Sequence, residues 1–142
     1  MITIVSYKSV GPIAFGMKPK DIYSALGTPR LSTKDRYGDT VHRYDNIFVT
    51  TNNDGVVEVE LLPDAAPNIL DIDILSNRHS LYLLSKIDAN PYECSGAIIL
   101  LNIGISITGM HDDLDYQKSV TAFARGRFDE LKKDMVPYVY AK

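Results

Sequence analysis

The sequence predicts one α+β domain with a mainly antiparallel sheet. The chain has 142 residues and no Gly-, Pro- or Ser-rich linker, which suits a single domain spanning residues 1–142. Short apolar segments alternate with turn residues, as in antiparallel strands. A short helix followed by three strands is indicated twice, at about residues 10–63 and 69–128. We therefore expect two helix–β–β–β halves with short helices packed on the sheet, either one continuous sheet or two packed ones.

The first helix is predicted over residues 19–26. Pro19 suits the first helical position, where a backbone N–H has no intrahelical acceptor. Met17 and Ile22 have the spacing of a hydrophobic staple across the helix start. Gly27 can take the left-handed conformation that ends a helix, and Pro29 prevents its continuation. Residues 11–30 are therefore interpreted as scaffold.

Three strands are expected to follow, at residues 40–44, 47–51 and 56–62. The segment "NNDG" at residues 52–55 is a strong turn signal between the last two. Residues 56–62 alternate, so that Glu58 and Glu60 lie side by side on the solvated face. Pro63 and Pro67 are expected to end the ladder.

The second half repeats this plan. A helix is expected from about residue 77 to 87, with Ser76 as its cap. Residues 97–101 and 105–108 then form a hairpin, and its first strand is apolar throughout, as in a strand covered on both faces. A third strand begins near Val120, and a last short helix covers residues 129–135.

Charge is distributed unevenly along the chain. The net charge is −3, but residues 51–100 carry eight acidic and two basic side chains. Between residues 54 and 73 there are six carboxylates and no Lys or Arg. Such a segment repels nucleic acid and attracts a basic partner. The basic run "ARGRFDELKK" at residues 124–133 is interrupted by acids, so no nucleic-acid partner is expected.

No residue set with the pattern of an active site stands out. Cys94 could pair with a histidine as nucleophile and base, but it lacks a local signature and suits a buried thiol. The run "HDDLD" at residues 111–115 is the one stretch that resembles a metal site, and it lacks the glycine and distal glutamate of a calcium loop. We therefore expect neither enzymatic activity nor a cofactor or metal.

Location follows from the same composition. A lone cysteine cannot form an intramolecular disulfide, which fits a reducing compartment. The N-terminus lacks the pattern of a signal peptide, and the longest apolar run, residues 97–101, is too short to cross a bilayer. The expectation is a cytoplasmic protein without a membrane role.

The segment "VGPIAFGMKPKDIYSALGTP" at residues 10–29 resembles the opening of a group of small bacterial proteins with the pattern G-P-I-x-F-G-M…L-G-x-P. The segments "GAIILLNIGISI" and "VTAFARGRFDE" also look like that group's downstream parts. Members include immunity proteins of bacterial toxin systems, among them contact-dependent growth inhibition. The helix-then-meander half also resembles the small lipoprotein of the outer-membrane assembly machine, although its lipid-attachment signal is not seen here. The shared residues are helix punctuation, so the resemblance implies a fold more than a function.

The resemblance and the charge pattern together predict an immunity protein that binds a cognate toxin domain, such as a nuclease, through an acidic surface. The expected state is a monomer. The residues expected to contact the toxin are Glu58, Glu60, Asp64, Asp71, Asp73, Asp112, Asp113 and Asp115. One alternative is a non-catalytic scaffold that holds its partner with a sheet edge or an apolar patch. Another is a metal-dependent hydrolase that uses His111 and the neighbouring aspartates.

Overall fold

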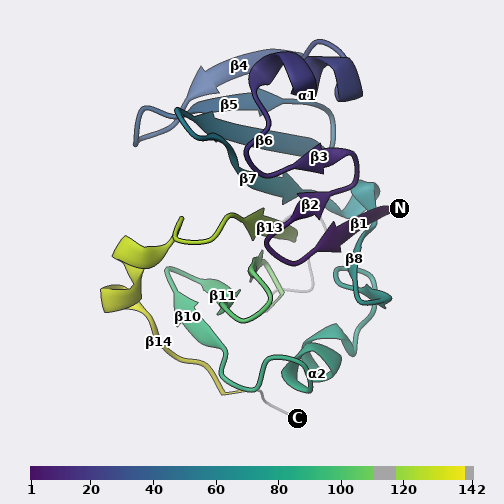
Figure 1. Ribbon diagram of the computed structural model, residues 1–142. Coiled ribbons are helices and arrows are strands. Elements are labelled where there is room, and N and C mark those ends of the chain that lie inside the picture. The colour runs from purple at the N-terminus through teal and green to yellow at the C-terminus, as the bar shows by residue number, and fades with distance from the viewer. Residues whose placement is uncertain (111–117, 140–142) are drawn as a thin grey trace.

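The computed structural model describes residues 1–110 and 118–139. It contains a nine-stranded sheet, the large sheet, with strand order β14-β10-β11-β12-β13-β7-β6-β5-β4. A five-stranded sheet, the small sheet, has the order β3-β2-β1-β8-β9. Figure 1 shows both sheets and the short helices beside them. The α+β class and the dominance of antiparallel pairing are confirmed.

The first half forms a helix and a four-stranded meander. Its elements are α1 (Pro19–Leu26), β4 (Leu31–Lys34), β5 (Thr40–Arg43), β6 (Ile47–Asn52) and β7 (Gly55–Leu61). The helix has the predicted bounds, and Gly27 after it has a φ of +85°. Strand β4 was not predicted, because its sequence "LSTK" shows no apolar alternation and its formation depends on pairing with β5.

The second half has the same order of elements. They are α2 (Ser80–Ser85), β10 (Tyr92–Cys94), β11 (Ala97–Leu100), β12 (Ile105–Thr108) and β13 (Ser119–Phe123). Helix α2 is shorter than predicted, and Ser76 does not cap it. Instead, Asn77 Oδ1 accepts the amide of His79 at 2.9 Å, which holds a turn just before the helix.

The two halves join into one continuous sheet. Strand β7 pairs with β13 in antiparallel register, with Val59 opposite Ala122 and Glu58 opposite Phe123. This pairing decides between the two sheet arrangements that the sequence left open. The predicted last helix is a 3₁₀-helix, η3 (Asp129–Asp134), and β14 (Val136–Pro137) pairs with β10 after it.

The small sheet was missed by the sequence interpretation. It contains β1 (Ile2–Val5), β2 (Ser9–Val10), β3 (Ile13–Ala14), β8 (Pro67–Ile69) and β9 (Ile72–Asp73), with the 3₁₀-helix η1 (Pro63–Ala65) before β8. The expectation that Pro67 ends a ladder was wrong, since it opens β8 and pairs in parallel with Ile2 of β1. Proline is compatible with the first residue of a strand.

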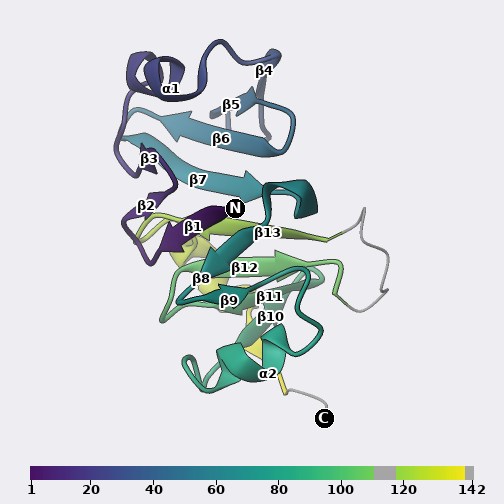
Figure 2. The ribbon, with the colours of Figure 1, turned by 90° about the vertical axis from the view of Figure 1, so that its right-hand side faces the viewer.

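The main core lies between the two sheets. One face of the large sheet contributes Val49, Leu61 and Ile107, and the small sheet contributes Ile4 and Ile69. Figure 2 shows the small sheet in front of the large one. Complete burial of each such side chain stabilises the fold by about 1.5–3 kcal/mol. The opposite face of the large sheet, here called the second face, carries Glu58 and Phe123 in directly paired positions.

Gly55 connects the loop before α1 to the large sheet. It has a φ of +93°, and a Cβ at this position would lie 2.2 Å from the carbonyl oxygen of Gly16. The neighbouring amide of Val56 donates to the carbonyl of Met17 at 2.9 Å. The turn predicted at residues 52–55 is confirmed, and its glycine also allows this close backbone approach.

Candidate functional site

A guanidinium and three carboxylates meet on the second face. Arg127 Nε donates to Glu58 Oε1 at 3.0 Å, and Arg127 Nη1 donates to Asp39 Oδ2 at 2.7 Å. Arg127 Nη2 lies 3.7 Å from Asp35 Oδ2. These four residues are called the Arg127 cluster. The arginine side chain is only 13% exposed, and the carboxylate side chains are 15–23% exposed.

The members come from three separate parts of the chain. Glu58 lies in β7, whose alternation directs it to the second face. Asp35 and Asp39 flank the β4–β5 turn, and Asp35 Oδ1 holds that turn by accepting the amides of Tyr37 and Asp39 at 2.8 and 3.0 Å. Arg127 follows β13 in the turn at Gly126, where φ is +82°. The antiparallel pairing of β7 with β13 brings these segments together.

Aromatic packing fixes the arginine segment on the sheet. Phe123 is 1% exposed, and its ring centroid lies 4.4 Å from that of Phe128, the residue after Arg127. The ring of Tyr7 meets Phe123 edge-on, with centroids 5.8 Å apart. The turn that carries Arg127 is therefore anchored by packed aromatic rings, and the guanidinium carbon lies 5.8 Å from the ring centroid of Tyr37.

The Arg127 cluster contains more acidic groups than basic ones. Burial raises the pKa of Glu58 by more than the hydrogen bond and charge of Arg127 lower it. Burial lowers the pKa of Arg127, but hydrogen bonds to Asp39 and Glu58 raise it by more, so the guanidinium stays charged. One positive charge faces three carboxylates, so the cluster attracts a further cation.

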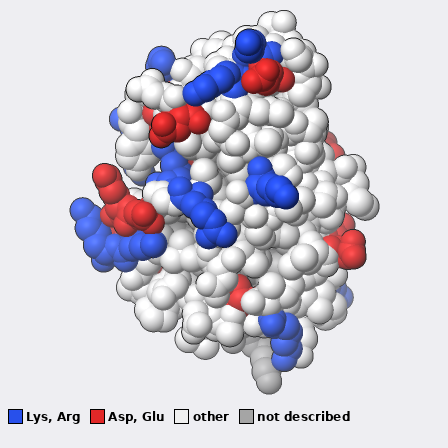
Figure 3. Space-filling model, in the orientation of Figure 1, with Lys and Arg blue, Asp and Glu red and all other residues white. Residues whose placement is uncertain are grey.

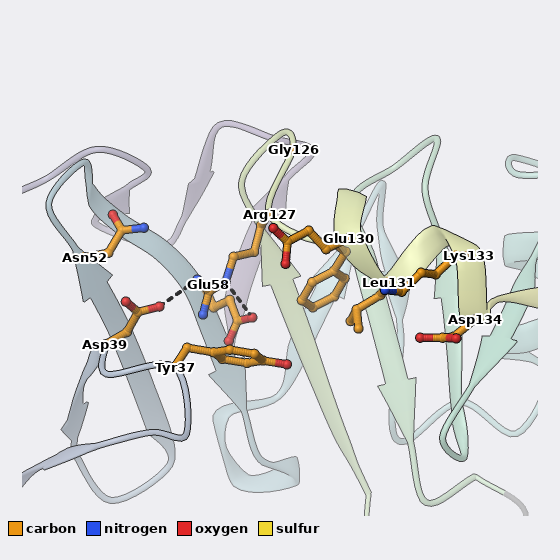
Figure 4. A pocket seen from close by; sticks show the side chains of 11 residues that line it. Tyr37, Asp39, Asn52, Glu58, Gly126, Arg127, Glu130, Leu131, Lys133 and Asp134 are labelled. Carbon is orange, nitrogen blue, oxygen red and sulfur yellow. Dashed lines mark hydrogen bonds and ion pairs between the residues drawn. The ribbon is translucent and has the colours of Figure 1, made fainter.

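A cleft of about 480 Å³ opens beside the cluster. Figure 4 shows Asp39, Glu58 and Arg127 converging, with the ring of Tyr37 alongside and η3 forming the other side. The charged residues that line the cleft are Asp39, Glu58, Arg127, Glu130, Lys133 and Asp134. Tyr37 is 59% exposed at the rim. A negatively charged cleft with an exposed aromatic ring suits a basic side chain or a cationic group.

The carboxylates predicted from the sequence do not form one surface. Glu58 and Glu60 lie on the second face, half-buried, opposite Phe123 and Thr121 of β13. The prediction that both are solvated was wrong for Glu58, which is ion-paired with Arg127. The remaining members within the described residues are exposed at η1, the β8–β9 turn and β9: Asp64, Asp71 and Asp73. Figure 3 shows acidic and basic side chains intermixed on the face it presents.

Asp112, Asp113 and Asp115, together with His111, lie outside the described residues. Among residues 1–110 and 118–139, no three His, Cys, Asp or Glu side chains are grouped so as to hold a metal ion. The aspartate-rich segment at residues 111–115 therefore stays a prediction.

His42 and Cys94 lie in different parts of the large sheet, and Cys94, expected to be a buried thiol, is only half-buried. His42 is 2% exposed and lies between two hydroxyls, with Nδ1 3.2 Å from Tyr23 Oη and Nε2 3.0 Å from Thr51 Oγ1. It links α1 to the sheet. Cys94 is half-buried in β10, near one end of the large sheet, whereas His42 lies in β5, near the other end.

Sequence reasoning missed Asp35, Asp39, Tyr37 and Arg127. The first three were outside the acidic segment, and Arg127 was interpreted as part of an interrupted basic run. One signal was present, because Asp35 and Gly38 are typical turn residues and mark the hairpin turn that contains Tyr37 and Asp39.

Comparisons with protein-family models, curated proteins and solved structures found no match. In the part of the chain that the structure describes, no helix has the length and apolar character needed to span a membrane. The geometry of the second face is therefore the main basis for a functional proposal.

Proposed function

We propose that this chain is an immunity protein, which binds a bacterial toxin domain in the cytoplasm and neutralises it without catalysing a reaction. The observation that carries the proposal is the acidic cleft on the second face, where one arginine faces three carboxylates. The resemblance of residues 10–29 to immunity proteins supports the class of partner.

The cleft suits a partner with a basic surface. Toxin nucleases carry basic grooves for phosphate, and carboxylates can occupy the positions of phosphates in such a groove. Opposite charge accelerates encounter, and truncation of a buried member of an interfacial charge pair costs about 2–5 kcal/mol. Tyr37, exposed at the rim, offers an aromatic anchor of the kind that dominates binding energy at interfaces.

The proposal assigns docking to the second face. Glu58 and Glu60 lie there, and Glu130 and Asp134 line the η3 side of the same cleft. Asp71 and Asp73 belong to the small sheet, which covers the other face of the large sheet. A partner on the second face therefore contacts the first group and leaves the small-sheet carboxylates in water.

Co-expression with the toxin domain encoded beside this gene tests the proposal. The double variant Glu130→Lys/Asp134→Lys reverses two exposed charges on η3 and leaves the Arg127 cluster intact. The matched control Asp64→Lys/Asp71→Lys makes the same change in net charge at exposed positions away from the second face. Growth rescue by wild type and the control, with rescue reduced by the η3 variant, is the expected result.

The complex should also associate more slowly as salt concentration rises, because an electrostatically steered encounter is screened. The proposal of toxin neutralisation fails if wild type gives no rescue. Equal rescue by both variants, with unchanged affinity at low salt, removes the second face as the docking surface.

A further inference from the structure

The outer edge of β4 is an open sheet edge. Within the described residues β4 pairs with β5 on one side and with no strand on the other. The opposite edge strand, β14, has two residues, one of them Pro137, and is blunted in the manner usual for sheet edges. Strand β4 contains no proline, and Leu31, Ser32 and Lys34 are exposed.

The ladder with β5 determines which backbone groups point outward. Leu31 pairs with Arg43 and Thr33 with Val41, and the amide of Asp35 donates to the carbonyl of Asp39 at 2.9 Å. Alternate residues of an antiparallel strand direct their N–H and C=O groups to the same neighbour. The N–H and C=O groups of Ser32 and Lys34 therefore face away from β5, toward the position of an additional strand.

Basic side chains surround this edge. Lys34 Nζ donates to Thr40 Oγ1 at 2.7 Å, and Arg36 Nη2 donates to the hydroxyl of Tyr37 at 2.8 Å. Neither contact neutralises the charge, because both partners are hydroxyls. Of the nearby acids, Asp45 is paired with Arg30, while Asp35 and Asp39 share Arg127. Among the described residues neither Lys34 nor Arg36 forms an ion pair, so an incoming strand meets two positive side chains at this edge.

Lys34 disfavours one way of pairing with a second copy of the chain. An antiparallel twofold register centred on Lys34, which lies in β4, places the two Lys34 side chains opposite each other. Registers centred on Ser32 or Thr33 stay possible and are outcomes of the test below. Like charges directly opposite each other destabilise a strand pair, whereas opposite charges stabilise it.

We propose that the outer edge of β4 accepts an extended acidic segment of another protein as an added strand. Backbone hydrogen bonds to Ser32 and Lys34 supply affinity, and Lys34 and Arg36 select carboxylate side chains. The edge adjoins the acidic cleft, because Arg36 contacts Tyr37 at its rim, but it attracts the opposite charge. It stands or falls independently of toxin neutralisation.

Three synthetic octapeptides test the edge by NMR titration of the ¹⁵N-labelled full chain. The first alternates glutamate with valine, the second replaces glutamate with lysine, and the third is the first peptide with every backbone amide N-methylated. The acidic peptide should shift and protect the amides of Ser32 and Lys34. The lysine peptide should bind at least about tenfold more weakly, and the N-methylated peptide should leave these amides unchanged because it has no N–H to donate to the edge.

Two variants separate backbone from charge. Ser32→Pro removes one outward N–H, a change that edge strands tolerate, and Lys34→Glu reverses the edge charge while keeping the backbone. Each should weaken binding of the acidic peptide about tenfold or more, with the thermal midpoint measured to show that each variant is folded. Equal binding of the acidic and lysine peptides, binding by the N-methylated peptide, or shifts away from β4 overturns the proposal. Sedimentation that shows a dimer dissociated by Ser32→Pro overturns it in favour of self-pairing.

Discussion

Replacement of Arg127 by methionine should destabilise the fold strongly at neutral pH. Methionine is a long, uncharged side chain, so it leaves Glu58, Asp39 and Asp35 without their shared counterion. Loss of one partner from a buried ion pair costs about 3–5 kcal/mol. Because these carboxylate side chains are still 15–23% exposed, we expect the lower end, about 3 kcal/mol.

Urea denaturation of wild type and Arg127→Met measures this loss, and a loss of that size should lower the thermal midpoint by about 10 °C in a domain of this size. Burial already raises the pKa of Glu58, and removal of the guanidinium raises it further. A carboxyl whose folded-state pKa is raised destabilises the fold above that pKa and ceases to do so as pH falls below the unfolded value. The difference between variant and wild type should therefore shrink toward pH 4.

The double variant Glu58→Gln/Arg127→Met supplies the control. A neutral amide at residue 58 removes one uncompensated charge, so the double variant should be more stable than Arg127→Met alone. The reasoning is refuted if Arg127→Met loses less than about 1 kcal/mol, or if its loss is independent of pH and unaffected by Glu58→Gln.

Three further changes probe the scaffold. Gly55→Ala should lower the free energy of unfolding in urea by at least about 3 kcal/mol, because the added Cβ would lie 2.2 Å from a backbone oxygen. Gly38 also has a positive φ, +82°, but no atom lies within 4 Å of its Cβ position, so Gly38→Ala should cost only about 1 kcal/mol. Similar losses for the two variants would contradict the close approach of the backbone at Gly55. Asp88→Ala should lower the free energy of unfolding by about 3 kcal/mol, because this buried carboxylate accepts hydrogen bonds from the backbone and side-chain amides of Asn102 at 2.9 and 3.1 Å. A loss below about 1 kcal/mol would show that these contacts are dispensable. Burial, and secondarily the charge of Lys34, lowers the pKa of His42 in the folded protein. The free energy of unfolding should therefore be unaffected by this residue above about pH 6.5 and should fall below that pH, as the folded state resists protonation of His42. Parallel profiles of unfolding free energy against pH for wild type and His42→Gln would contradict this.

Helix-end and turn residues predicted the elements that are determined by residues close together in the sequence. Pro19 and Gly27 bounded α1 correctly, and the turn at residues 52–55 marked the β6–β7 hairpin. The small sheet could not be predicted in this way. Its strands have two to four residues, and β1 pairs with β8 across more than sixty residues of sequence. The sequence of β1, "ITIV", does alternate, but it is only four residues long and carries no sign of its distant partner.

The site was predicted less completely than the fold. The sequence identified Glu58 as a binding residue. Its ion-pair partner Arg127 lies 69 positions away, and the other two carboxylates that pair with Arg127 lie in the β4–β5 turn. A count of charges along a segment of sequence groups residues that the fold places on different faces. Alternation directs Glu58 to the second face, and the small sheet carries Asp71 and Asp73 to the other side. Tertiary pairing, absent from any local window, decides which carboxylates act together.

Amide hydrogen exchange of the chain with and without the neighbouring toxin domain tests the central claim most directly. Binding at the acidic cleft should slow exchange at Tyr37, Asp39 and the η3 segment, and should leave the β8–β9 turn unchanged. Slowed exchange confined to Asp71 and Asp73, with the cleft unaffected, would contradict docking on the second face.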